Sequence, residues 1–541
     1  MKVFFLYSVI IPSAVMSLVA KFPPKSSHVY QNACRSFSKS SLAAIASSEG
    51  SIPHQQTRDD RYNQLMKATT LSLAPMMEYT DRHFRHLVRL VSSETLLYTE
   101  MVAANALVHE RKDAMERYCE ENPEVANDET HVRANYESHY LRRFLRQSGI
   151  EVPPAEGASV LQLGGSDPEQ LYGAVQTVME MTERGICDYT AINLNCGCPS
   201  PKVAGKGCFG AALMDDPKLV AELTSAMHEG CQGQIPITVK CRIGTDSNQA
   251  FNKAQYAQID EEKEYNQLCE FIEAVASPGI VSDFSVHARI AVLQKSFSPA
   301  DNRKIPPLKY HYIQKLVEDY PEFTFSVNGG IETIPEIKAQ LEASPGLKGV
   351  MVGRSWAADP WSFAMADHVL YNKEEPSTLQ NRYEILKAYA KYADEEERQG
   401  DPVKIRRFIT KAITPLFSGE KNSKRYRIAL DEIAGIPKKL HSQGKSLEGQ
   451  PPISELIMNC ALEHLPEDAL YRSREESYKR VLEAEERKNG SDRSTAVQEW
   501  QTRRKLESDG SYERMLSVGM EPSKSDGKLQ QNNVGSTAEA V

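Results

Sequence analysis

Eight short apolar runs, each followed by a loop of polar residues and glycines, succeed one another between residues 71 and 355. The runs span residues 71–76, 96–102, 159–165, 189–195, 236–243, 283–289, 324–330 and 349–355. Stretches with helical spacing lie between them, for example at 217–227 and 310–319. Strands that alternate with helices pair in parallel, and eight such units predict a closed (β/α)8 barrel, the TIM barrel. A doubly wound open sheet is the alternative, but no G-x-G-x-x-G motif follows the first run.

The composition is that of an ordinary globular protein, with 40% hydrophobic and 25% charged residues. A chain of 541 residues exceeds one ordinary domain. The net charge of −9 argues against a protein that coats nucleic acid over its whole surface. Cys196 and Cys198 form a C-x-C without a matching second pair, so we expect reduced thiols and no metal site. We also expect a monomer.

The first 60 residues have the composition of a targeting leader. An apolar stretch at 4–20, broken by Pro12, is short for a membrane span and typical of a signal segment. Residues 21–48 contain basic residues and many serines but no acidic residue, as transit peptides do. The two parts together predict a bipartite leader for a plastid, with a mitochondrial or cytoplasmic protein as alternatives and a simple secretory signal or anchor as another reading. We expect no membrane segment in the mature form.

The loop after the fourth run contains a cysteine in the sequence Asn195-Cys196-Gly197-Cys198-Pro199. Barrel enzymes carry their chemistry in the loops at the carboxyl ends of the strands. A thiol there can donate a proton as a general acid, so we predict Cys198 as the catalytic residue. The alternative is a loop cysteine without a role.

Glycines at the ends of the seventh and eighth runs predict a phosphate site. Asn328-Gly329-Gly330 closes the seventh and Gly353-Arg354 the eighth. Barrels commonly bind phosphate at these two strand ends, where glycines let backbone N–H groups approach the anion. Either glycine pair alone is an ordinary turn.

Polar side chains also interrupt three other runs, at Gln162, Lys240 and His287. A charged group is costly in an apolar run unless it has a partner. The three side chains could satisfy one another. Beside a phosphate site they fit better as donors to the pyrimidine edge of a flavin, where the cation would stabilise negative charge on the reduced ring.

A basic segment follows the barrel. Residues 403–445 contain eleven Lys or Arg and three Asp or Glu, a local charge of +8. Such a segment is often a solvated helix face, but on an acidic protein, with Tyr426 available to stack on a base, it predicts RNA binding. We expect the leader at 1–60, the barrel at 65–371 with an insertion at about 111–157, a helical domain at 372–464, and a charged, largely disordered tail at 465–541 that includes a solvated helix from about 472 to 507.

Eight motifs together resemble the tRNA-dihydrouridine synthases, from about residue 71 to 430. They are APMMEYTDRH at 74–83, LYTEMV at 97–102, LQLGGS at 161–166, LNCGCPS at 194–200, VKCRIG at 239–244, VHAR at 286–289, NGGI at 328–331 and VGR at 352–354. SPADNRKIPPL at 298–308 resembles the bacterial A-type subfamily. The leader, the insertion and the tail fall outside the resemblance.

The resemblance implies an oxidoreductase that uses FMN, reduced by NADPH or NADH, to reduce the C5–C6 bond of a D-loop uridine in tRNA, at position 20 or 20a. Cys198 would protonate C5. The resemblance implies that the flavin is held by Pro75, Met76, Met77, Gln162, Lys240, His287, Asn328, Gly329, Gly330, Gly353 and Arg354. It implies that the tRNA is bound by Asn195 and Arg289 at the uracil and by Arg303, Lys424 and Arg427 elsewhere. Cys196 departs from the A-type pattern, which has an apolar residue, and we expect it to be tolerated, although it could offer a second thiol near the flavin.

Two other functions fit part of the sequence. A flavin barrel for a free small molecule, like the dihydroorotate-type dehydrogenases, leaves the basic segment without a use. A tRNA-binding protein that has lost catalysis leaves Cys198, Lys240 and His287 without a use.

Overall fold

The computed structural model describes residues 56–150, 152–200, 203, 209–247, 251–256, 259–374, 379–489, 521–522 and 529–530. Eight parallel strands close into a barrel in sequence order, and β1 pairs with both β2 and β8. The strands are β1 (Leu71–Leu73), β2 (Leu96–Ala103), β3 (Ser159–Gly164), β4 (Ala191–Cys196), β5 (Ile237–Arg242), β6 (Asp283–His287), β7 (Thr324–Asn328) and β8 (Gly349–Val352). Each lies within or one residue beyond a predicted run, so the barrel prediction is confirmed.

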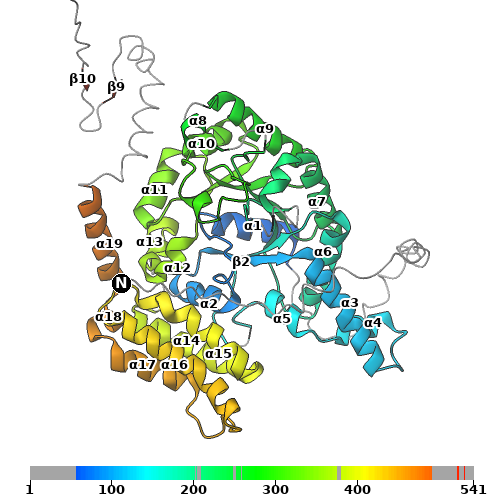
Figure 1. Cartoon of the computed structure of the whole chain (residues 1–541), viewed down its shortest axis with the longest axis vertical. Helices are drawn as coiled ribbons and strands as arrows, with labels where there is room; N and C mark the ends of the chain where they lie inside the picture. Colours follow the sequence, from blue (N-terminus) through cyan, green and yellow to red (C-terminus); the bar gives the residue numbers. More distant parts are fainter. Residues whose placement is uncertain are drawn as a thin grey trace, which may run out of the picture. The chain divides into compact units, whose positions relative to one another are not determined.

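Helices surround the strands (Figure 1). The barrel part contains α1 (Arg58–Ala68), α2 (Arg82–Val91), α6 (Pro168–Glu183), α7 (Pro217–Gly230), α8 (Lys253–Tyr256), α9 (Glu261–Ala276), α10 (Tyr310–Asp319), α11 (Ile334–Ala343), α12 (Arg354–Ala358) and α13 (Ala366–Tyr371), with short 3-10 turns η2 (Gly210–Asp215), η3 (Asp301–Arg303) and η4 (Pro360–Phe363). An aspartate cap followed by proline begins α6 and α7, because the carboxylate accepts free N–H groups and proline needs no partner at the first position.

Helix α1 begins at the edge of the predicted leader. Residues 1–55 lie outside the described residues, but α1 begins at Arg58, inside the predicted leader of 1–60. The Arg61 guanidinium donates to the Tyr189 carbonyl at 2.6 Å and to the Asp188 carboxylate at 2.6 Å. The helix is therefore held against the segment that leads into β4.

The predicted insertion at about 111–157 is helical: it contains the second half of α3 (Ala104–Glu121), and all of α4 (Glu129–Asn135) and α5 (His139–Leu145). Glu180 of α6 joins α3 to α4, since its carboxylate accepts from Arg111 at 2.8 Å and from the Tyr136 hydroxyl at 3.3 Å.

The second part of the chain is helical. It contains α14 (Arg382–Gln399), α15 (Pro402–Ile413), η5 (Thr414–Phe417), α16 (Ser423–Ser442), α17 (Ile453–His464), α18 (Glu467–Tyr471) and α19 (Arg474–Asn489). One hydrophobic cluster continues from the barrel into α14–α17. The short strands β9 (Glu521–Pro522) and β10 (Leu529–Gln530) pair antiparallel.

This part differs from the prediction at its end. Helix α19 lies within the solvated helix that we expected at about 472–507, but α18 and the start of α19 pack against the rest of the protein, whereas we expected a solvated tail from residue 465. Leu470 of α18 is buried, and Arg474, the first residue of α19, is fully buried. Local composition hid this packing because the buried residue that begins α19 is a charged arginine, Arg474. Among the described residues, no helix is both long and apolar enough to cross a bilayer.

Candidate active site

Hydrogen bonds from strands β4 and β5 hold the loop that carries Cys198. Asn195, the penultimate residue of β4, accepts from the backbone N–H groups of Gly197 at 3.1 Å and Cys198 at 3.0 Å. From β5, the buried Arg242 guanidinium donates to the Gly197 carbonyl at 2.9 Å. Cys198 is a free, half-buried cysteine. The loop therefore presents a thiol at the carboxyl end of the barrel, where the sequence predicted it.

A row of buried amides crosses three strands beneath this loop. Asn195 donates to the Gln162 side-chain oxygen at 2.8 Å, and Gln162 donates to Asn193 at 2.9 Å. Asn193 in turn donates to the Thr238 hydroxyl at 2.8 Å. Since each amide has its oxygen and nitrogen engaged, the row fixes which way Gln162 and Asn195 face.

Lys240 projects from β5 toward β7, where its ammonium donates to the Asn328 side-chain oxygen at 3.1 Å. Asn328 also donates to the Met351 carbonyl at 2.7 Å. Burial, with the Arg242 charge nearby, lowers the pKa of Lys240 to about 8. The lysine is thus a cation that sits beside the end of β7 and gives up its proton more readily than an exposed lysine.

Two further side chains with buried nitrogens follow: His287 is the last residue of β6, and Arg289 lies in the loop after it. The Nδ1 atom of His287 and an Nη atom of Arg289 are buried, and neither has a hydrogen-bond partner among the described residues. Burial, followed by the charges of Arg242 and Lys240, lowers the pKa of His287 well below its usual value. Burial also lowers the pKa of Arg289, whose Nε donates to the Pro306 carbonyl at 2.7 Å. Buried nitrogens without partners fit an anionic or acceptor-rich ligand.

The alternative in which Gln162, Lys240 and His287 satisfy one another is wrong. Gln162 bonds Asn193 and Asn195, and Lys240 bonds Asn328.

The glycines at the strand ends lie tightly against neighbouring side chains, so a Cβ would crowd them. Gly329 and Gly330 have φ of 112° and 75°, a region that favours glycine. A Cβ on Gly329 would lie 3.0 Å from Nε2 of His287, and one on Gly353 would lie 3.1 Å from the sulfur of Met76. Met76 and His287 therefore line the same strand ends as the predicted phosphate residues.

The other predicted flavin residues lie at the ends of the same strands. Pro75 and Met76 are half-buried after β1, whereas Met77 is exposed. Arg354 is exposed at the start of α12, and its charge contributes to the lowered pKa of His287. Cys196 is fully buried in the hydrophobic core, so it replaces an apolar residue and offers no thiol to the mouth of the barrel.

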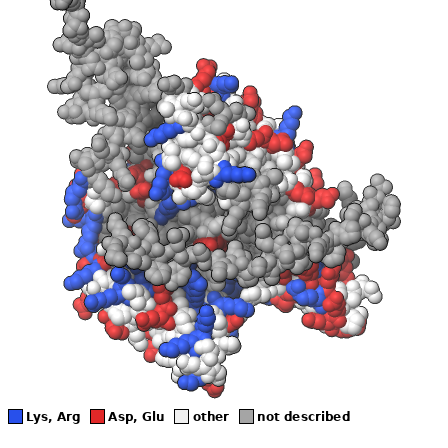
Figure 2. All heavy atoms as spheres, in the orientation of Figure 1, with Lys and Arg blue, Asp and Glu red and all other residues white. Residues whose placement is uncertain are grey.

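The predicted tRNA contacts are exposed side chains outside the barrel interior. Arg303 is exposed in η3, and Lys424 and Arg427 are exposed on α16. Figure 2 shows basic side chains among acidic ones over the helical part. Tyr426 corrects our expectation of a stacking residue: it is fully buried, with its ring 5.2 Å from that of Phe417. It faces the core together with Leu430, Ile433 and Pro437, which follow at helical spacing on the buried side of α16.

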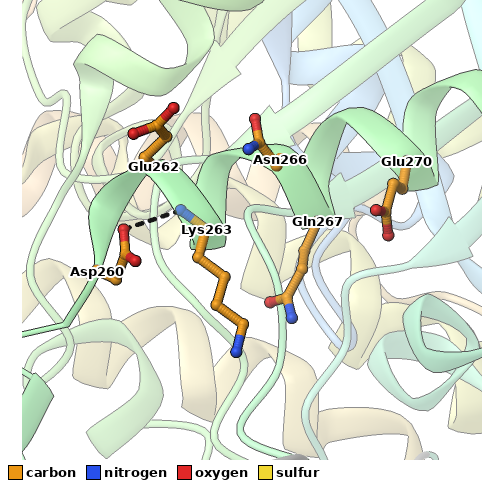
Figure 3. Close-up of a pocket in the computed structure, with 6 residues that line it drawn as sticks. All are labelled: Asp260, Glu262, Lys263, Asn266, Gln267 and Glu270. Carbon is orange, nitrogen blue, oxygen red and sulfur yellow. Dashed lines mark hydrogen bonds between the residues drawn. The ribbon is translucent and has the colours of Figure 1, made fainter.

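A surface hollow lies elsewhere, along α9 (Figure 3). It is lined by Asp260, Glu262, Lys263, Asn266, Gln267 and Glu270, none of which is a predicted site residue. Its side chains come from one helix and its cap, so we assign it no chemistry. Among the described residues, no group of three or more His, Cys, Asp or Glu could hold a metal ion.

Sequence reasoning missed Asn193 and Arg242. Both lie in motifs that we quoted or next to one, but only the fold brings Asn193 against Gln162 and Arg242 against the Cys198 loop. A polar residue inside an apolar strand was the available signal, as it was for Lys240.

Known proteins are similar to this chain from the first barrel strand into the helical part. Residues 72–447 match the dihydrouridine synthase (Dus) family. A tRNA-dihydrouridine(20/20a) synthase of Synechocystis sp. is 36% identical over 362 residues, which cover 67% of this chain and 88% of that protein. A protein of the same name from Shewanella oneidensis is 35% identical over 379 residues, which cover 70% of this chain and 91% of that protein. Another from Escherichia coli K12 is 36% identical over 363 residues, which cover 67% of this chain and 86% of that protein. The chain belongs to the dihydrouridine synthase family.

Proposed function

We propose that this chain is an FMN-dependent oxidoreductase that uses NADPH or NADH to reduce the C5–C6 bond of a D-loop uridine in tRNA, at position 20 or 20a, and acts as a monomer. The relatives carry the name of this activity. The observation that carries the proposal is the free Cys198 thiol, on a loop fixed by Asn195 and Arg242, above strand ends with unsatisfied buried donors.

FMN fits these strand ends. The buried Nδ1 of His287 and the Lys240 ammonium can meet its polar ring edge or phosphate. The backbone N–H groups at Gly329, Gly330 and Gly353 would approach the phosphate. Gln162, Asn328 and Arg354 would add polar contacts, and Pro75, Met76 and Met77 apolar ones. When bound, the flavin supplies the hydride.

The protein's own residues supply a proton and an orientation. Cys198 Sγ–H donates its proton to C5 of the uracil, and Asn195 and Arg289 hold the base. Arg242 keeps the loop of Cys198 in place through the Gly197 carbonyl. A uridine in tRNA must leave its stack to enter the barrel mouth. Contacts to tRNA phosphates outside the mouth position it, and Lys424, Arg427 and Arg303 are the residues we assign to them.

Mass spectrometry of tRNA incubated with the protein and NADPH tests this function. We expect tRNA to gain two mass units per modified uridine, while free uridine and orotate stay unchanged. Reduction of orotate instead would favour the small-molecule dehydrogenase. A purified protein without a flavin spectrum, even after incubation with FMN, would favour a binding protein without catalysis.

Residues 1–60 support a proposal on location, through their apolar, basic and serine-rich composition. We propose that they direct the protein to an organelle, and we favour a plastid. A fluorescent protein fused to residues 1–60 should accumulate there, and diffuse cytosolic fluorescence would contradict this.

A further inference from the structure

The turn that follows β1 pushes two large side chains into solvent. Met77 is 54% exposed and Tyr79 is 52% exposed, although both lie at the carboxyl end of the barrel, next to the half-buried Met76. Glu78, between them, has φ of 65°, a left-handed backbone conformation that residues other than glycine rarely adopt. A turn of this kind persists only where its surroundings hold it.

Two elements hold this turn by its backbone. The Glu78 N–H donates to the carboxylate of Glu100 on β2, and the Glu78 carbonyl accepts from the Lys411 ammonium at 2.6 Å. Lys411 belongs to α15 of the helical part, and its ammonium also lies 5.3 Å from the centre of the Tyr79 ring. The barrel and the basic segment thus meet at this turn, and together they fix an exposed aromatic ring at the rim.

We propose that Tyr79 is a stacking platform for the tRNA base next to the extruded uridine, with Lys411 beside it to meet the adjoining phosphate. This inference rests on the proposed function. Proteins that recognise single-stranded RNA stack its bases on aromatic rings, and the neighbours of an extruded base lose a stacking partner that a protein ring can replace. An ammonium has three donors, so Lys411 can hold the Glu78 carbonyl and still bond a phosphate oxygen.

The charge and the position of Tyr79 and Lys411 indicate which kind of ligand binds there. The exposed ring lies at the end of the barrel that holds Cys198, and the cation at its face belongs to the segment of local charge +8. A nucleotide offers both a ring for Tyr79 and an anion for Lys411, whereas an apolar ligand would leave the ammonium unused.

The test compares Tyr79→Ala with Tyr79→Phe on three substrates, in the full-length protein loaded with FMN. One substrate is a tRNA transcript, and the other set consists of the same tRNA with an abasic site on the 5′ or 3′ side of the target uridine. On intact tRNA, we expect Tyr79→Ala to lower kcat/KM about tenfold or more, the scale of one lost base–aromatic stack. Tyr79→Phe should stay within about twofold of wild type, because the ring remains.

On one of the two abasic tRNAs, wild type and Tyr79→Ala should be equal within about twofold, since the base that stacks is gone. Tyr172→Ala, which removes an exposed tyrosine of α6, is the matched control and should match wild type on every substrate. Lys411→Met should lower kcat/KM on intact tRNA as well, and should flatten its dependence on salt.

Three results would overturn the inference. They are wild-type kcat/KM for Tyr79→Ala on intact tRNA, an equal loss on intact and both abasic tRNAs, and a slower reduction of bound FMN by NADPH in Tyr79→Ala. If wild type forms no dihydrouridine in any tRNA, the proposed function itself fails, which is a separate outcome from a failure of Tyr79.

Discussion

The loop that carries Cys198 is held through its backbone by Asn195 and Arg242, and these bonds do not involve the Cys198 thiol. Asn195 holds its backbone N–H, and the thiol is left half-buried and free. We expect Cys198→Ala to bind FMN and accept electrons from NADPH as wild type does, while dihydrouridine formation falls about 100-fold or more, the usual scale of a lost general acid. Stopped-flow flavin absorbance and tRNA mass spectrometry measure the two steps separately.

Cys196→Val is the control for that prediction. Cys196 is buried among apolar side chains, so a valine of similar size should leave both steps nearly unchanged. If Cys198→Ala formed dihydrouridine at the wild-type rate, Cys198 would not be the general acid.

We expect Lys240 to make the binding of FMN depend on pH. Burial lowers its pKa to about 8, so the lysine is charged below that pH and becomes neutral above it. Its attraction for the negative charge of FMN is therefore present below pH 8 and is lost as the pH rises. For protein stripped of FMN, the dissociation constant should rise above pH 8 by up to about tenfold per unit. Quenching of flavin fluorescence measures it.

Lys240→Met supplies the comparison. This variant should bind FMN more weakly at pH 7 and show a flat profile between pH 7 and 9. Identical profiles for the variant and wild type would mean that another group titrates.

At the scale of elements, β3, β4 and β5 share the row of side chains from Asn195 to Thr238. Asn193→Ala removes the acceptor of the Gln162 nitrogen and one hydrogen bond of the Thr238 hydroxyl. Gln162 and Asn195 then lose their fixed orientation, so we expect the rate of uridine reduction to fall about tenfold to a hundredfold. Thr238→Val, which removes only the last link, should have a smaller effect. Steady-state kcat for both variants tests this order, and equal kcat values would contradict it.

Helix α16 carries the predicted docking charges on its exposed side. Replacing Lys424 and Arg427 with glutamine should raise the KM for tRNA and lower the slope of log affinity against log salt by roughly one for each lost phosphate contact. Filter binding at several salt concentrations measures the slope. Reduction of FMN by NADPH should not change.

The control replaces Lys112 and Lys338, which are exposed lysines of α3 and α11, with glutamine. It removes the same number of positive charges and should leave the slope of log affinity against log salt unchanged. Normal tRNA affinity at every salt concentration in the Lys424 and Arg427 variant would show that α16 is not the docking surface.

At the scale of the whole molecule, buried charges join the helical part to the barrel. Glu396 of α14 accepts from Arg82 of α2 at 2.9 Å and from Arg146 at 2.9 Å. Arg474 of α19 donates to the carbonyls of Leu90 and Val91, the last residues of α2, and to those of Ala364 and Leu379. The last carbonyls of a helix have no partner within the helix, so Arg474 completes α2.

We expect Arg474→Ala to lower the free energy of unfolding by roughly 2–4 kcal/mol, because it leaves several buried carbonyls without donors. Urea unfolding followed by tryptophan fluorescence measures it, since the guanidinium lies 5.3 Å from the centre of the Trp361 ring. Arg480→Ala removes an exposed arginine of the same helix and should change stability by about 0.5 kcal/mol or less. Equal stabilities would mean that α19 is not needed to complete the barrel.

The amino-acid sequence by itself determined the barrel and the place of the thiol. Strand and helix periods are local patterns, and parallel strands bring all their carboxyl ends to one side, so Cys198, Lys240, His287 and Gly329 could be placed from the chain alone. The tertiary structure decided which side chains meet. Asn193 bonds Gln162 across 31 positions, and Arg474 reaches Val91 across 383. Tyr426 is buried for the same reason, since the neighbours that cover one side of a helix come from distant parts of the chain, and local composition carries no record of them.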